Sequence, residues 1–153
     1  MIEHLRILTA KEVRTLIEEL NEHFDSKFST DKAMVENNKR KIFLINKDYG
    51  RIDEKKLRIN NLGLYFCTRE KDGFRLSLEG SQMINPQKNF YSVTKEMAAK
   101  WIAGENIEAN EPLEGYVIIK YKDDAIGCGK FKEGIILNAV SKERRIQAVV
   151  INN

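Results

Sequence analysis

The apolar positions between residues 9 and 24 recur with helical spacing. Charged side chains fill the positions between them, so the apolar ones form one stripe, which is typical of a helix that packs on a core. The stripe consists of Val13, Leu16, Ile17, Leu20 and Phe24. Thr9 and Glu12 have the spacing of a capping box, which predicts that the helix begins just after Thr9.

The next part of the chain favours strands. Residues 25–39 are polar and irregular, and we expect a loop or a short frayed helix there. Runs of β-branched and aromatic residues then alternate with turn signals such as Asp48-Tyr49-Gly50 and Lys71-Asp72-Gly73. Strands are predicted at residues 41–47, 56–60, 62–70 and 74–78. A short helical turn is predicted over 78–84.

A polar segment around Pro86 divides the chain. We predict a first domain over 1–86 and a second over 87–153. In the second, a strand at 90–93 leads to a short helix that Thr94 caps and Gly104 ends. Further strands are predicted at 115–121, 125–131, 134–138 and 145–151. Short strands at this spacing favour a small β-barrel or sandwich, so the predicted class is α+β.

Composition gives only general information about the class of protein. The chain has 153 residues, of which 32% are charged and 42% hydrophobic, as in a soluble globular protein. It contains no long apolar run, and the first residues lack an apolar signal core, so we expect a cytoplasmic protein without membrane association. Cys67 and Cys128 are far apart and are expected to be buried free thiols.

The net charge of +3 hides an uneven distribution. Residues 39–75 and 120–153 carry net charges of +6 and +3, whereas residues 1–38 and 76–119 each carry −3. If the two basic blocks meet in the fold, they form a positive strip suited to nucleic acid. A set of solvated surfaces without such a role is the alternative.

The segment Gly127-Cys128-Gly129-Lys130 invites a nucleotide-binding interpretation, which its surroundings contradict. A P-loop needs a glycine where Asp124 stands and a hydroxyl residue where Phe131 stands. A dinucleotide fingerprint opens a helix, and here a strand follows. We therefore expect the two glycines to permit a bulge, or the close approach of another backbone, which could be that of a nucleic acid beside Lys130.

Catalytic and metal sites have little support in the sequence. His4 and His23 stand at either end of the first helical region, with no cysteine pair nearby to complete a zinc site. Cys67 lies in an apolar strand, and no Gly-x-Ser-x-Gly motif occurs. We expect no metal, no cofactor and no enzymatic activity of the chain's own.

The basic residues are the best candidates for function. Lys and Arg bind phosphates, and Asn can contact a base edge or a sugar. Phosphate contacts are expected from the cations of the first hairpin and of the C-terminal segment, with Asn138 beside them. The predicted RNA-binding residues are Arg69, Lys71, Arg75, Lys130, Asn138, Lys142, Arg144 and Arg145.

Five short motifs follow one another in a recognisable order. They read REKDGFRLS (69–77), KWIAGENI (100–107), GYVIIKY (115–121), AIGCGK (125–130) and GIILNAVSKERR (134–145). Their order and spacing resemble the C-terminal RNA-binding segment of RsmF-type RNA cytosine-C5 methyltransferases of the Sun/Fmu group. Gly129, Lys130, Asn138, Lys142 and Arg145 agree with that pattern, whereas Cys128 replaces an aromatic residue.

The resemblance implies a PUA-like β-barrel that binds structured RNA, and residues 1–61 resemble the α+β pre-PUA module that often precedes it. The family's catalytic domain has no counterpart in this chain, so no catalytic residue carries over. We expect an RNA-binding module for rRNA or tRNA, acting in RNA modification or ribosome assembly. A protein-interaction subunit that docks onto a separate methyltransferase or ribosomal factor is the alternative. An enzyme with an unrecognised site is a third, weaker option.

Overall fold

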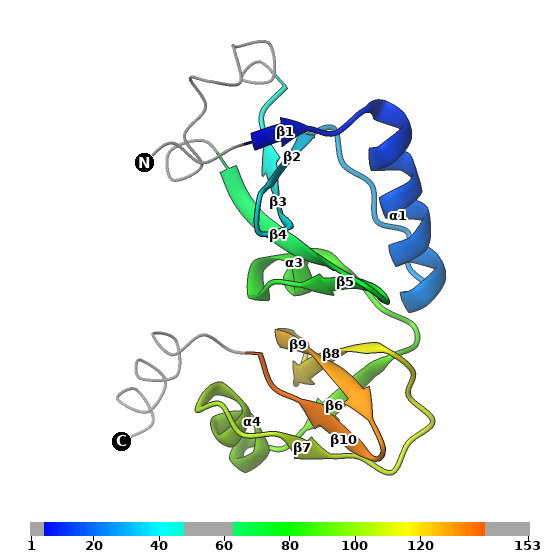
Figure 1. Cartoon of the computed structure of the whole chain (residues 1–153). Helices are drawn as coiled ribbons and strands as arrows, with labels where there is room; N and C mark the ends of the chain where they lie inside the picture. Colours follow the sequence, from blue (N-terminus) through cyan, green and yellow to red (C-terminus); the bar gives the residue numbers. More distant parts are fainter. Residues whose placement is uncertain (1–4, 48–62, 140–153) are drawn as a thin grey trace.

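A computed structural model describes residues 5–47 and 63–139 of the chain. Two sheets account for all the strands in these ranges, and Figure 1 shows the second sheet below the first. The predicted strands at 56–60 and 145–151 lie outside the described residues. The α+β class is confirmed.

The first part comprises one long helix, five strands and one short helix. Their bounds are β1 Leu5–Ile7, α1 Ala10–Phe24, β2 Ala33–Asn37, β3 Lys41–Ile45, β4 Gly63–Glu70, β5 Gly73–Leu76 and α3 Leu78–Met83. The strands pair in chain order, β1-β2-β3-β4-β5, and every pair is antiparallel. The sheet is thus a simple meander, which places successive turns at alternate ends.

The capping box at the start of α1 is confirmed. Thr9 Oγ1 accepts a hydrogen bond from Glu12 N at 3.1 Å, and Glu12 Oε1 accepts one from Thr9 N at 3.0 Å. Two of the amide groups that a helix start leaves without partners are satisfied in this way. Leu16, Leu20 and Phe24 are buried, as the stripe predicts.

The prediction of a loop or a short frayed helix over 25–39 is wrong for its second half, because β2 occupies Ala33–Asn37. Met34 and Val35 are both fully buried, on opposite faces of the sheet. The strand ends in polar residues, so its apolar pattern is too short to show in the sequence. The strand is stabilised by its pairing with β1 and β3, which the sequence of β2 alone does not show.

The second part contains a curled sheet and one helix. Its elements are β6 Phe90–Val93, α4 Lys95–Ile102, β7 Ile107–Glu108, β8 Tyr116–Tyr121, β9 Asp124–Lys132 and β10 Ile135–Leu137. The strand order is β6-β8-β9-β10-β7, with β6 parallel to β8 and the other pairs antiparallel. The curled half-barrel agrees with the predicted small barrel.

Gly127 and Gly129 make room for the ring of Trp101. A Cβ atom at Gly129 would stand 2.6 Å from Trp101 Cη2, and one at Gly127 would stand 2.9 Å from Trp101 Nε1. The indole also donates a hydrogen bond to Ile126 O at 3.2 Å. Beside this contact the β8–β9 register shifts between Ile119 and Lys120. The predicted bulge is confirmed, and the group that approaches the glycines is a side chain of α4.

The two sheets share one apolar core. It joins Phe24 of α1 and Phe66 of β4 to Ile118 of β8, all without solvent exposure. Polar contacts reinforce the junction, since Phe24 O accepts from Gln87 N at 2.8 Å and His23 Nε2 donates to Tyr116 O at 2.7 Å. The two sheets therefore form one packed body. The predicted boundary between residues 86 and 87 stays a prediction.

Both cysteines are free and buried, as expected. Burial raises the pKa of each thiol, to about 12 for Cys128. At neutral pH both side chains are therefore neutral thiols, and they contribute to packing.

The contact between Trp101 and Gly129 yields a stability prediction. Gly129→Ala should lower the free energy of unfolding by about 1–3 kcal/mol, because the added methyl group collides with Trp101 and with Leu137 O at 2.5 Å. Urea unfolding followed by fluorescence measures the loss. The chain has one tryptophan, so its emission should shift as well.

Gly134→Ala is the matched control. Gly134 has a φ of +83° and open space around it, so the substitution adds backbone strain without a collision, worth about 1 kcal/mol. Tryptophan emission should stay unchanged in this variant. Equal emission shifts in the two variants would contradict the packing argument.

Candidate nucleic-acid interface

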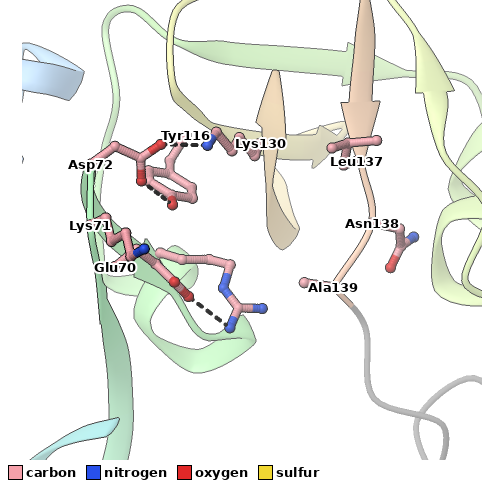
Figure 2. Close-up of a pocket in the computed structure, with 9 residues that line it drawn as sticks. Glu70, Lys71, Asp72, Tyr116, Lys130, Leu137, Asn138 and Ala139 are labelled. Carbon is pink, nitrogen blue, oxygen red and sulfur yellow. Dashed lines mark hydrogen bonds and ion pairs between the residues drawn. The ribbon is translucent and has the colours of Figure 1, made fainter. Parts of the chain in front are cut away.

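A hollow of about 490 Å³ lies where the β4–β5 hairpin meets the second sheet. Figure 2 shows hairpin residues on one side and residues of β8, β9 and β10 across from them. We refer to this site as the hollow. Its lining residues are Glu70, Lys71, Asp72, Arg75, Tyr116, Lys130, Leu137, Asn138 and Ala139.

Tyr116 holds the hairpin against the second sheet. Its ring packs on the turn, since a Cβ atom at Gly73 would stand 3.5 Å from Tyr116 Cε2. Gly73 itself has a φ of +144°, a conformation open to glycine and strained for other residues. The hydroxyl group of Tyr116 donates a hydrogen bond to Asp72 Oδ1 at 2.7 Å. Ring and hydroxyl together fix the hairpin tip.

Asp72 links Tyr116 to Lys130 at one wall of the hollow. Lys130 Nζ lies 2.5 Å from Asp72 Oδ2, and Lys130 stands opposite Tyr116 in the β8–β9 register. The hydrogen bond from Lys130, and then that from Tyr116, lowers the pKa of the Asp72 carboxyl. Burial, followed by the contact with Asp72, raises the pKa of the Tyr116 hydroxyl. Asp72 is thus a carboxylate and Tyr116 a neutral phenol at neutral pH.

The other two hairpin cations differ in their pairing. Arg75 Nη2 lies 3.2 Å from Glu70 Oε1, and both side chains line the hollow. Lys71 is exposed and makes no ion pair with any residue of the described ranges. With Lys130, the wall carries three cations against the two carboxylates of Glu70 and Asp72. This wall thus has an excess of one positive charge, and two of its three cations are paired with carboxylates.

Arg69 lies outside the hollow. Its Nε atom is 3.0 Å from Glu36 Oε2, and its guanidinium group lies 5.2 Å from the centre of the Phe74 ring. Glu36 also pairs with Arg6, so the buried carboxylate stands between two arginines. Removing either arginine would leave this carboxylate less compensated, which assigns Arg69 a structural contact.

Asn138 lines the hollow, and its side-chain amide donates hydrogen bonds to backbone carbonyls of the protein. The two hydrogen atoms of Nδ2 go to Trp101 O at 2.6 Å and Glu105 O at 2.8 Å. Trp101 O lies in the last turn of α4, and Glu105 O lies in the segment that follows the helix. The predicted contact of Asn138 with a base or sugar stays a prediction.

The predicted RNA-binding role of these residues stays a prediction, and the structure gives the positions of those in the described ranges. The structure brings Lys71, Arg75, Lys130 and Asn138 together around one hollow and leaves Arg69 apart. Lys142, Arg144 and Arg145 lie outside the described residues. The described chain ends at Ala139, which itself lines the hollow.

Five lining residues were not predicted as members of the site: Glu70, Asp72, Tyr116, Leu137 and Ala139. Glu70 and Asp72 alternate with cations in the hairpin sequence, and this alternation was the signal for compensating pairs. Tyr116 stood among several aromatic residues that suited either a core or a base stack. The fold shows that the Tyr116 ring is buried and that its hydroxyl group donates a hydrogen bond to Asp72.

Comparison with known protein families shows what the second part of the chain is similar to. Residues 88–146 match the family described as Methyltransferase RsmF PUA domain. This segment is PUA-like, and we refer to it as the PUA domain. It contains the second sheet with α4, and four of the five sequence motifs lie within it. Among curated proteins, none matches the chain.

The PUA domain suggests RNA binding, in the context of the RsmF family. It supplies Tyr116, Lys130 and Asn138 to the hollow, and the hairpin that faces them precedes the matched segment. The hollow is therefore a joint feature of the PUA domain and the first sheet.

Two further observations concern the described ranges alone. They contain no group of three or more His, Cys, Asp or Glu side chains that could hold a metal ion. None of their helices combines the length and the apolar character that a membrane span requires.

The Asp72 contacts predict the order of two effects on its ionisation. Lys130→Gln should raise the pKa of Asp72 toward its ordinary value near 3.9, and Tyr116→Phe should raise it by less. Carboxyl carbon chemical shifts followed by NMR between pH 2 and about 6 measure both values. A larger effect from Tyr116→Phe would show that the phenol, rather than the ammonium group, is the main partner.

Proposed function

We propose that the chain is an RNA-binding module that recognises structured rRNA or tRNA, in RNA modification or ribosome assembly, without catalytic activity of its own. The match of residues 88–146 to the RsmF PUA domain carries this proposal. The cations of the hollow, at the edge of that domain, support it. The first sheet, which resembles a pre-PUA module in sequence, would then be part of the binding unit.

Phosphate groups are the natural ligands of the hollow. Lys71 offers an ammonium group without a protein partner in the described ranges, so a phosphate can bind it directly. Lys130 and Asp72 are 42% and 46% exposed, and ion pairs at such sites contribute only about 0–1 kcal/mol. An RNA phosphate can therefore replace Asp72 as the partner of Lys130 at small cost.

The catalytic step belongs to another protein in this proposal. The matched family couples the PUA domain to a methyltransferase by name, whereas the sequence shows no cofactor-binding glycine loop. The module would hold an RNA segment while a separate methyltransferase or assembly factor acts on it. Docking onto such a protein remains the alternative role for the same surface.

Loss of the two ammonium groups should weaken RNA binding. The double variant Lys71→Gln/Lys130→Gln removes two phosphate contacts, each worth about fivefold in affinity, so the dissociation constant should rise about 25-fold. The slope of log affinity against log salt should fall by about 1.5–2. Filter binding with bulk tRNA and with rRNA, each over a salt series, measures both quantities.

Lys95→Gln is the matched control for this pair. Lys95 is exposed at the start of α4 and lies outside the lining of the hollow. Its replacement should change affinity by less than about twofold, as long-range charge effects are screened beyond about 10 Å at ordinary salt. Unchanged affinity in the double variant, with wild type binding firmly, would remove the hollow as the RNA site.

Removal of the competing carboxylate should have the opposite effect. Asp72→Asn frees Lys130 and adds one positive charge to the net charge of the hollow, so RNA affinity should rise about threefold to fivefold. The salt slope should become steeper. The same titration measures the change, and a drop in affinity would mean that Asp72 positions Lys130 for RNA instead of competing with it.

A further inference from the structure

The turn between β2 and β3 presents three consecutive cations. Lys39, Arg40 and Lys41 are all exposed, and we refer to them as the basic turn. Asn37 organises the turn, since its Oδ1 atom accepts from Lys39 N at 3.0 Å and from Lys41 N at 2.9 Å. Asn37 is buried, so the basic turn is anchored to the sheet.

Arg40 occupies a backbone conformation that arginine rarely adopts. Its φ is +64°, in the left-handed region that favours glycine or asparagine. Its amide donates to Asn37 O at 3.1 Å, and its carbonyl accepts from Arg69 N at 2.8 Å. The turn is therefore held from both sides, and Arg40 is exposed.

The basic turn lies at the same end of the first sheet as the hollow. In the strand registers, Lys41 stands opposite Thr68, and Thr68 stands opposite Arg75, a residue that lines the hollow. The β2–β3 and β4–β5 turns thus project from one end of the sheet. Neighbouring strands lie roughly 5 Å apart, so the centres of the two turns are about 10 Å apart.

The cations of the basic turn are less compensated than those of the hollow. Neither Lys39 nor Arg40 forms an ion pair with another residue that the structure describes. Lys41 Nζ lies 5.2 Å from the centre of the Tyr65 ring, a contact that leaves its charge intact. Arg75 and Lys130, in contrast, each face a carboxylate.

We propose that the basic turn is a second phosphate-binding site, which extends the RNA path from the hollow across the end of the first sheet. The ligand is the sugar–phosphate backbone of structured RNA, which supplies successive phosphates to rigidly held cations. This inference rests on the proposed function. It adds a contact from the part of the chain that precedes the matched PUA domain, so that the RNA spans both sheets.

Arg40→Gly separates binding from stability. Glycine relieves the left-handed strain, so the melting temperature should stay the same or rise by about 2 °C. The lost phosphate contact should weaken binding to fluorescein-labelled bulk tRNA about fivefold and lower the salt slope by about 0.7–0.9. Fluorescence anisotropy over a salt series measures affinity, and Lys39→Gln should reproduce the weakening without the change in backbone strain.

Lys122→Gly is a closely matched control. Lys122 has a φ of +55°, is exposed, and lies in the β8–β9 turn, about 17 Å along β8 from Tyr116 and the hollow. The variant loses the same charge and the same kind of strain, and its affinity should change by less than twofold. If Arg40→Gly and Lys122→Gly bind alike, the basic turn is not a site, whereas absence of wild-type binding would refute the proposed function itself.

Discussion

Burial of one apolar core between the two sheets is the constraint on which the other features depend. Phe24, Phe66 and Ile118 come from three distant parts of the chain and share this core without solvent exposure. Their burial contributes about 1.5–3 kcal/mol per side chain and fixes β8 against the first sheet. The hollow exists because this packing places the β4–β5 hairpin opposite Tyr116 and Lys130. A loosely joined pair of domains would not keep these groups in register.

The second organising feature is charge compensation. At the hollow, Arg75 and Lys130 are each paired with a carboxylate, whereas Lys71 is not. Among the described residues, Lys39 and Arg40 of the basic turn form no ion pair either. The buried carboxylate of Glu36 is compensated by Arg6 and Arg69, so Arg69 stabilises the fold. Arg75 and Lys130 form exposed pairs that a phosphate can enter. Neither the total charge nor the charge of each segment shows which cations are paired with carboxylates.

Local signals in the sequence predicted much of the fold. Thr9 and Thr94 cap their helices as expected, and the glycines near Trp101 mark a bulge. β2 could not be predicted, because its burial depends on partners on both sides. The structure places the hairpin and Lys130 around one hollow. The contacts of Arg69 and Asn138 depend on carboxylates and carbonyls that are remote in sequence, so the sequence could not show them.

The parallel pairing of β6 with β8 has a consequence for how the PUA domain is made. Phe90 pairs with Ile118, which is synthesised 28 residues later, and α4 and β7 lie between them. Contacts of such long range form slowly, since a large loop must close before they are gained. Because β6 precedes β8 in the chain, β6 cannot form this pairing until β8 has been synthesised. An unpaired strand edge is a template for wrong strand pairing, so the order of synthesis exposes β6 to that risk.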